Sequence, residues 1–444
     1  QNQIMESKSL TKIKILSKNF IKSSNDDDNY HAKTYKLSFF DQFALQMHVP
    51  TVFFYPLKNS TFTKISIIHE RLEQSLSKFI THVYPTSGRF ASDGQSINCH
   101  DEGVLYIKAK VDSQFCDFLK DARKDIDLAL YFCPKFDRND SNLCTNPIVI
   151  VQVTEFACGT GLALCLSTEH AVIDGFTAGK FIYEWSKVSK MGINSDMINC
   201  FTFNDFGTIF PALSDNRLSK IVKSPSDDSI KMVARRFVIS ESAISRLMET
   251  IEVVYFRPSR VTALVWRALI NVSQRKNNGR LRPCLLIIPV NLRGKIDFPS
   301  YKNSFGNFAI EVPVKFIPGE TRMELKDIVL LLKDVIQKIT VYISLAKSSD
   351  MCSLASKFHE EIQEWEENEQ VDVCMASSLC GFPINKVDFG WGNPCLTSLG
   401  LRRSDMFWLY DPECGNGIVV QADLKKDYME MFGCDEEFFI QSRI

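Results

Sequence analysis

The sequence predicts an α/β protein made of two domains, and three observations support this. The chain has 444 residues, more than one hydrophobic core usually organises. Both halves mix strand-like runs with helices of three- and four-residue apolar spacing. Between them, residues 192–233 lose this periodicity and carry Gly, Asn, Asp, Ser and Pro. We therefore expect an N-terminal domain over 1–191, a crossover loop over 192–233 and a C-terminal domain over 234–444.

The elements expected in the first half follow from the spacing of apolar residues. The apolar run of residues 35–56 ends in Tyr-Pro and indicates a strand. Residues 66–83 place apolar side chains three and four positions apart, which predicts an amphipathic helix, closed by a Pro/Gly turn. Further along, we expect strands at 105–111, 146–156 and 161–170 and a helix at 174–191.

The second half repeats the mixture of strands and helices. Ser240 can cap a helix that has Glu241 in its first turn, and β-branched runs indicate the strands. The expected elements are a strand at 231–240, helices at 240–251 and 263–274, strands at 284–293 and 305–316, and a helix at 324–345.

Composition excludes several classes of protein. The 52 basic and 53 acidic residues leave a net charge of -1, and no basic cluster suits nucleic acid or an anionic membrane. The 14 cysteines include no CxxC pair, which argues against a zinc or thioredoxin-type site and favours a reducing compartment. No membrane-spanning stretch or signal peptide is evident, so we expect a cytoplasmic protein.

The stretch STEHAVIDGF, residues 167–176, places His170 at the end of an apolar strand and Asp174 four positions later. A histidine at a strand end is often purely structural. A metal site is disfavoured because HxxxD supplies two ligands, and a Ser-His-Asp hydrolase because no GxSxG is present. The alternative is a general base, since imidazole can accept the proton of an acceptor hydroxyl while a thioester supplies the acyl group.

A second motif, DFGWG, comprises Asp388, Phe389, Gly390, Trp391 and Gly392. Its two glycines allow positive φ angles and its tryptophan can pack into a core. The residues themselves therefore predict a tight structural turn.

The two motifs together resemble the plant BAHD acyltransferases, whose markers are HxxxD in mid-chain and DFGWG near the C-terminus. The resemblance extends over nearly the whole chain and is closest to the alkaloid O-acetyltransferase branch. Further matching blocks are YKLSFFDQ, VPTVFFYP, SLSKFITHVYPTSGR, PVNLR and SFGN.

This resemblance implies two domains of chloramphenicol-acetyltransferase-like topology with a solvent channel at their interface. Acyl-CoA, most simply acetyl-CoA, would enter from one face as a co-substrate, and a small-molecule alcohol from the other. The family also implies a monomer with no bound cofactor and no metal. A malonyl donor would need a facing cation, and Gln421 stands where a basic residue could have served.

The resemblance also assigns roles to residues. His170 is the general base, and Asp174 forms a bidentate pair with Arg293 instead of joining a charge relay. Gly175 lets the backbone turn tightly behind Asp174, and the DFGWG residues support the channel wall. Ser304 and Asn307 are expected to bind CoA.

One position departs from the family pattern. Leu379 stands where relatives have a tryptophan that can donate to the oxyanion, so Ser377 and Ser378 are the candidate donors. The function expected is therefore transfer of a small acyl group from CoA to a hydroxyl of a plant specialised metabolite, an alkaloid first. The alternatives are another acyl donor, a catalytically impaired binding protein, and a condensation-type domain.

Overall fold

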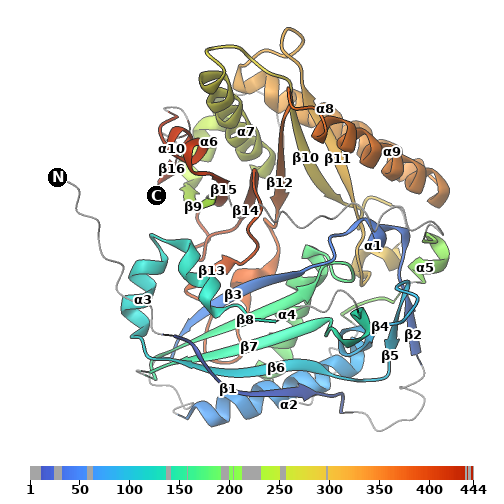
Figure 1. The fold of residues 1–444 in the computed structure, drawn as a ribbon, viewed down its shortest axis with the longest axis vertical. Coiled ribbons are helices and arrows are strands. Elements are labelled where there is room, and N and C mark those ends of the chain that lie inside the picture. The colour runs from blue at the N-terminus through green and yellow to red at the C-terminus, as the bar shows by residue number, and fades with distance from the viewer. Residues whose placement is uncertain are drawn as a thin grey trace.

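The computed structural model describes residues 12–24, 33–57, 64–136, 142–157, 159–191, 200–203, 205–212, 232–250, 257–296, 299–435, 438 and 442–443. These residues form two large mixed sheets, one smaller sheet and the helices that cover them (Figure 1). Most of the expected crossover loop, residues 192–233, lies outside the described residues.

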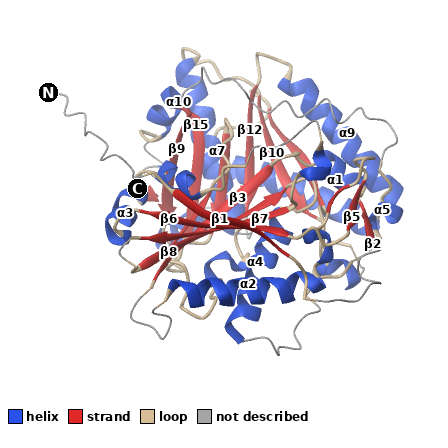
Figure 2. Ribbon diagram, turned by 60° about the horizontal axis from the view of Figure 1, so that its bottom comes forward, coloured by secondary structure: helices blue, strands red, loops and turns tan. Residues whose placement is uncertain are grey.

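The N-terminal sheet has six strands in a mixed arrangement. Their order is β1 (Lys14–Ile21), β6 (Val104–Val111), β7 (Val149–Phe156), β8 (Gly161–Glu169), β3 (His48–Pro56) and β13 (Leu396–Leu399). Helices α2 (Ile65–His82) and α4 (Gly175–Met191) lie on one face (Figure 2). On β3, Phe53 and Tyr55 pack toward that face, while Val52 and Phe54 pack against α3 (Phe115–Ala122) on the other. Burial on both faces explains the continuous apolar run at residues 52–55 of this strand.

The C-terminal sheet has seven strands. Their order is β11 (Ala309–Phe316), β10 (Cys284–Asn291), β12 (Asp372–Ser378), β14 (Met406–Tyr410), β15 (Ile418–Lys425), β9 (Met232–Ile239) and β16 (Ser442–Arg443). Its outer face packs on helices α6 (Glu241–Thr250), α7 (Arg257–Lys276), α8 (Leu325–Leu345) and α10 (Lys426–Phe432). Helix α9 (Ser348–Glu366), which the apolar pattern did not single out, packs on β11.

The two sheets share one hydrophobic core. Ile287, Met375 and Trp408, on the inner face of the C-terminal sheet, belong to the same buried cluster as the core of the N-terminal sheet. Strand β13 comes from the C-terminal half and pairs antiparallel with β3, Leu396 opposite Phe54. The strand β13 therefore links the C-terminal half of the chain to the N-terminal sheet. The domain boundaries stay a prediction.

The run 35–56, expected as a strand, is interrupted. It contains the end of β2 (Lys33–Lys36), helix α1 (Phe39–Phe43) and then β3. The cause is local: Ser38 and Asp41 form a capping box, in which each side chain accepts the backbone N–H of the other residue. Strand β2 joins the small sheet in the order β2, β5 (Ser96–Cys99), β4 (Arg89–Phe90).

Short helical segments complete the described chain. These are η2 (Tyr84–Ser87), η3 (Ile126–Phe132), η4 (Leu143–Thr145), α5 (Phe206–Ile209), η6 (Pro299–Asn303) and η7 (Pro383–Lys386). Within the described ranges, no helix combines the length and apolar character that a bilayer crossing requires. The thirteen cysteines in those ranges are all free thiols.

Candidate active site

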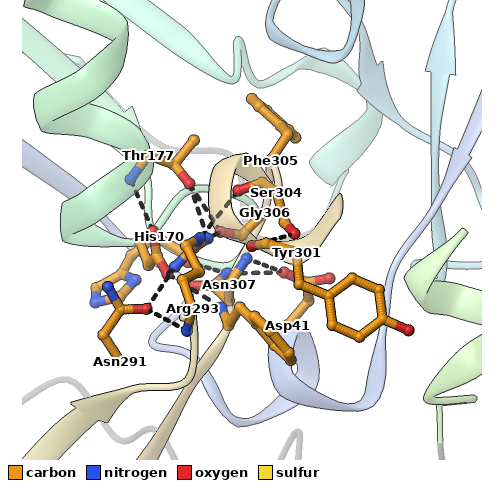
Figure 3. Close-up of polar contacts among 12 residues, drawn as sticks. Asp41, His170, Thr177, Asn291, Arg293, Tyr301, Ser304, Phe305, Gly306 and Asn307 are labelled. Atoms are coloured by element: carbon orange, nitrogen blue, oxygen red, sulfur yellow. Dashed lines mark hydrogen bonds and ion pairs between the residues drawn. The ribbon is translucent and has the colours of Figure 1, made fainter. Parts of the chain in front are cut away.

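His170 lies where β8 leaves the sheet, five residues before α4. Its backbone is fixed on both sides: its N–H donates to the carbonyl of Met47 at 2.8 Å, and its carbonyl accepts from Nδ2 of Asn307 at 2.8 Å. The first contact comes from the residue just before β3. The second comes from the loop before β11 (Figure 3), so both halves of the chain position His170.

The imidazole of His170 lines a cavity of about 230 Å³ between the two sheets. Its Nδ1 is buried and has no hydrogen-bond partner among the described residues. Within the described part of the chain, no carboxylate accepts a hydrogen bond from this nitrogen, unlike in a Ser-His-Asp triad. The wall is largely apolar and includes Phe40, Phe43, Val49, Thr51, Ile173, Phe176, Met375, Leu379, Leu399, Leu401 and Trp408.

The Asp174 carboxylate is turned toward the protein and not toward the imidazole. Oδ1 accepts the backbone N–H of Thr177 at 2.8 Å, which caps the first turn of α4. Oδ2 accepts Nη1 of Arg293 at 2.7 Å and the N–H of Phe308 at 3.0 Å. Burial alone would raise the pKa of this carboxyl, but Arg293 and the backbone donors outweigh it and hold the pKa below its ordinary value of 3.8.

Arg293 uses its guanidinium to connect several segments. Nε donates to the carbonyl of Ser304 at 3.0 Å, and Nη2 donates to the carbonyl of Gly306 at 2.8 Å. Only Nη1 reaches Asp174, so the contact is single and the expected bidentate pair is not formed. The other guanidinium nitrogens are occupied by backbone carbonyls, which makes Arg293 an organiser of the loop as well as a partner of Asp174.

A second carboxylate, which the sequence reasoning missed, completes this network. Asp41 Oδ1 accepts both the backbone N–H of Asn307, at 3.0 Å, and its Nδ2, at 2.9 Å. The same Nδ2 donates to His170, so Asp41 fixes the residue that fixes the base (Figure 3). Burial raises the pKa of Asp41 to about 6, although the bonds from Ser38 and Asn307 oppose this. The SxxD capping pattern at Ser38 was the available signal.

The residues expected to bind CoA have structural contacts here. Ser304 is 0% exposed, does not line the cavity, and its hydroxyl donates to the carbonyl of Tyr301 at 2.8 Å. Asn307 lines the cavity, but its side-chain amide is engaged with Asp41 and His170. In this geometry both residues shape the loop that holds the site.

Ser377, Ser378 and Leu379 all line the cavity, at the end of β12. Gly175 faces this segment from the start of α4, and a Cβ added to it would lie 3.1 Å from Cδ2 of Leu379. Its φ angle is not positive, so the expected tight turn is not the reason for a glycine here. The absence of a side chain instead leaves room for Leu379 beside the helix start.

The DFGWG turn lies at the opposite end of α4 and does not line the cavity. Asp388 Oδ1 accepts the N–H of Gly390 at 2.8 Å and that of Gly392 at 2.9 Å, and Oδ2 pairs with Nζ of Lys190 at 2.7 Å. Phe389 is fully buried and stacks on Trp391 with ring centroids 5.6 Å apart. Although burial opposes ionisation, Lys190 and the backbone donors hold the pKa of Asp388 below its ordinary value.

Comparison with known sequences places these features in context. The sequence model of the Transferase family matches residues 11–439. Akuammiline synthase 2 of Alstonia scholaris is 31% identical over 394 residues, covering 86% of this chain and 84% of that protein. Salutaridinol 7-O-acetyltransferase of Papaver somniferum is 27% identical over 471 residues, covering 95% of this chain and 96% of that protein.

Solved structures share the fold. Vinorine synthase superposes with a TM-score of 0.76 at 23% identity, covering 95% of this chain and 96% of its own. F. graminearum TRI101 complexed with Coenzyme A and T-2 mycotoxin superposes with a TM-score of 0.72 at 14% identity, covering 93% and 99%. These matches confirm the expected two-domain α/β fold.

Proposed function

Because this chain belongs to the Transferase family of BAHD acyltransferases, we propose that it moves an acetyl group from acetyl-CoA to a hydroxyl of a plant alkaloid. Membership of the family makes it an acyltransferase. Two comparisons support the finer proposal: one relative is named as an O-acetyltransferase of salutaridinol, and one protein of the same fold was solved with Coenzyme A.

The observation that carries the proposal is the position of the His170 ring. It lies on the wall of a cavity between the two sheets, its backbone is held by Met47 and Asn307, and Asp174 is turned away from it. A neutral imidazole in this position can accept a proton without a second acid group.

The reaction then proceeds in two steps. As the acceptor oxygen attacks the thioester carbonyl, Nε2 of His170 takes the hydroxyl proton and a tetrahedral intermediate forms. When the carbon–sulfur bond breaks, the same nitrogen returns the proton to the CoA sulfur, which leaves as the thiol. The imidazole is thus regenerated in each turnover.

We assign stabilisation of the tetrahedral oxyanion to Ser377, Ser378 or a water molecule that they hold. Both serines line the cavity, and the neighbouring Leu379 has no polar side chain to donate. Loss of one such donor commonly costs about 3 kcal/mol of transition-state stabilisation. Replacing each serine with alanine should show which one lowers kcat.

The roles of Asp174, Arg293, Ser304 and Asn307 in this proposal are positional. Their hydrogen bonds connect the start of α4 to the loop before β11, which holds the backbone of His170. Gly175 leaves space at the helix start, and the DFGWG turn fixes the far end of the same helix.

The choice of acetyl as the acyl group rests on the named relative. Gln421, which the sequence suggested as a donor-side position, is fully buried and does not line the cavity. Comparing turnover of acetyl-CoA and malonyl-CoA with one acceptor tests this part directly. Faster turnover of malonyl-CoA would contradict it.

The proposal as a whole is tested by incubating the protein with acetyl-CoA and a panel of alkaloid alcohols, while a thiol reagent reports free CoA. His170→Ala should lower the rate about a thousandfold and leave the melting temperature nearly unchanged. His359→Ala, which removes another imidazole from the same cavity wall, should retain measurable turnover. Equal loss in both variants, or CoA binding without release for any acceptor, would contradict the assigned base and favour a binding protein.

We also propose that the enzyme acts as a monomer in the cytoplasm, as the family resemblance implies. The free thiols of the thirteen described cysteines support a reducing compartment. Size-exclusion chromatography with light scattering and a fluorescent fusion in plant cells test the two parts separately.

A further inference from the structure

Two charged side chains on the cavity wall contact no opposite charge within the described part of the chain. Glu311 lies on β11, and Arg403 lies just before β14; both are half-buried and line the cavity. Arg403 Nη1 approaches Sδ of Met375 at 3.9 Å, a weak contact for a guanidinium. The third charged lining residue, Asp174, is already neutralised by Arg293. The cavity therefore presents two head groups with unused bonding capacity.

The charge around this pair is negative. Glu311 is attracted by Arg403 and repelled by Glu366, which lies on α9 outside the cavity wall and is itself attracted by Arg403. Two carboxylates thus share the field of one guanidinium. Burial, with Glu366 adding to it, raises the pKa of Glu311, and Arg403 opposes the rise. An incoming cation would relieve this imbalance.

The Glu311 carboxylate also lacks the donors that partly buried carboxylates usually have. Across the described ranges, no N–H or O–H group donates to it. A carboxylate that is partly removed from water without such donors keeps unused acceptor capacity, so it can accept a hydrogen bond from a ligand. Because Glu311 lines the cavity, a ligand bound there can reach it.

The surrounding wall suits a cation better than an anion. The rings of Phe40, Phe43 and Trp408 line the same cavity, and aromatic faces attract ammonium groups. A carboxylate-bearing acceptor would be attracted by Arg403 but repelled by Glu311. A protonated amine would be attracted by Glu311 and by the aromatic rings, and the repulsion from Arg403 would be offset in part by Glu366.

We propose that Glu311 recognises a protonated amine on the acceptor, so that the cavity selects basic amino alcohols over neutral ones. This inference rests on the proposed function, because it takes the cavity as the acceptor site. The acceptor that the site recognises is then an alcohol with an ammonium group elsewhere on the same molecule.

The test uses three matched probes. Para-(dimethylaminomethyl)benzyl alcohol is cationic at neutral pH, para-isobutylbenzyl alcohol is its neutral isostere, and para-(hydroxymethyl)phenylacetate is anionic. Calorimetry without an acyl donor measures the Kd of each probe, and CoA release from acetyl-CoA measures kcat/KM. We expect the wild-type protein to bind the cationic probe at least about tenfold more tightly than the neutral one, as one charge-assisted hydrogen bond allows.

Two substitutions distinguish direct binding by Glu311 from the effect of negative charge elsewhere near the cavity. Glu311→Gln should abolish the preference for the cationic probe and leave the affinity for the neutral probe within about twofold. Glu366→Gln removes the same charge near Arg403 but outside the cavity wall, and should keep the preference. Melting temperatures establish that both variants are folded, and the wild-type preference alone tests the proposal if Glu311→Gln does not fold.

Three outcomes would overturn the inference: no preference for the cationic probe in the wild-type protein, an equal loss for both probes in Glu311→Gln, or tightest binding of the anionic probe that Arg403→Gln removes. Because calorimetry needs no turnover, Glu311-dependent binding without CoA release would instead count against the proposed function alone.

Discussion

The two ends of α4 are both fixed by sequence motifs, but by different physical means. At the N-terminal end, the side chains of Asp174 and Arg293 are 10% and 2% exposed and form a buried ion pair between the two halves of the chain. At the C-terminal end, Lys190 and Asp388 are 55% and 19% exposed, and the Arg71 guanidinium donates to the carbonyls of Ser189 and Lys190. Both ends place charge favourably for the helix dipole.

The two motifs therefore support the site by different interactions. Breaking a buried pair leaves an uncompensated charge, so the HxxxD end is rigid and intolerant of change. The DFGWG end relies on hydrogen bonds from backbone N–H groups to the Asp388 carboxylate and on stacked rings, with an ion pair at the surface that water screens. The catalytic end therefore depends on buried charge, and the supporting end depends on turn geometry.

The largest expected effect is at Asp174. Asp174→Asn should lower the free energy of unfolding by about 3–5 kcal/mol, because Arg293 stays buried without a counter-charge. Since the pKa of Asp174 is lowered in the fold, this stability is present above its ordinary value of 3.8 and is lost as pH falls through the folded value. Urea unfolding measures this loss of stability. Asp388→Asn, at the C-terminal end of α4, is the matched variant for comparison. A larger loss in Asp388→Asn would reverse the comparison.

Asp41 gives the catalytic end a pH dependence of opposite sign. Its pKa is raised from 3.8 to about 6, so its contribution to stability is present at low pH and is lost as pH rises through about 6. The full change is about 3 kcal/mol. Asp41→Asn should flatten this part of the stability profile and also slow turnover, because the Asn307 link to His170 loosens.

Asp423, in β15, provides the control for that experiment, because burial raises its pKa to about 6 as well. Asp423→Asn should flatten a similar part of the profile without disturbing Asn307. If both variants slow turnover equally, the positioning role of Asp41 is wrong.

At the C-terminal end, the two glycines of DFGWG should differ. Both have positive φ angles, 113° at Gly390 and 106° at Gly392, so alanine is strained at each by about 1–2 kcal/mol. A Cβ on Gly390 would also lie 2.8 Å from Nη2 of Arg71, whereas one on Gly392 meets nothing within 4 Å. Gly390→Ala should therefore cost about 1 kcal/mol more in thermal unfolding. Equal costs would show that Arg71 moves freely.

The smallest effect is expected at Lys190. Lys190→Met should cost at most about 1 kcal/mol, because its pair with Asp388 is largely exposed. The difference from the wild-type protein should disappear in high salt, which screens exposed charges. A loss that persists in high salt would mean that this end also depends on ionic bonding.

Local patterns predicted much of the fold. The helix expected at 174–191 is α4, and the strand expected at 161–170 is β8, so His170 was placed correctly between them. The run 35–56 was mispredicted because a capping box interrupts it, a signal of two residues within a long apolar stretch. Strand β13 could not be placed, since its partner β3 lies more than 300 residues earlier.

Local sequence patterns were enough to locate the base, its flanking helix and the DFGWG turn, because these depend on residues close together in the chain. Tertiary structure decided that Asp41 and Asn307, 266 residues apart, hold the backbone of His170, and that Glu311 and Arg403 meet at one cavity. Such contacts are set by how the two sheets and the segments between them pack around one core. The spacing of residues along the chain does not predict that packing. Buried side chains and buried polar groups find their partners among residues that are near in space but can be far apart in the sequence.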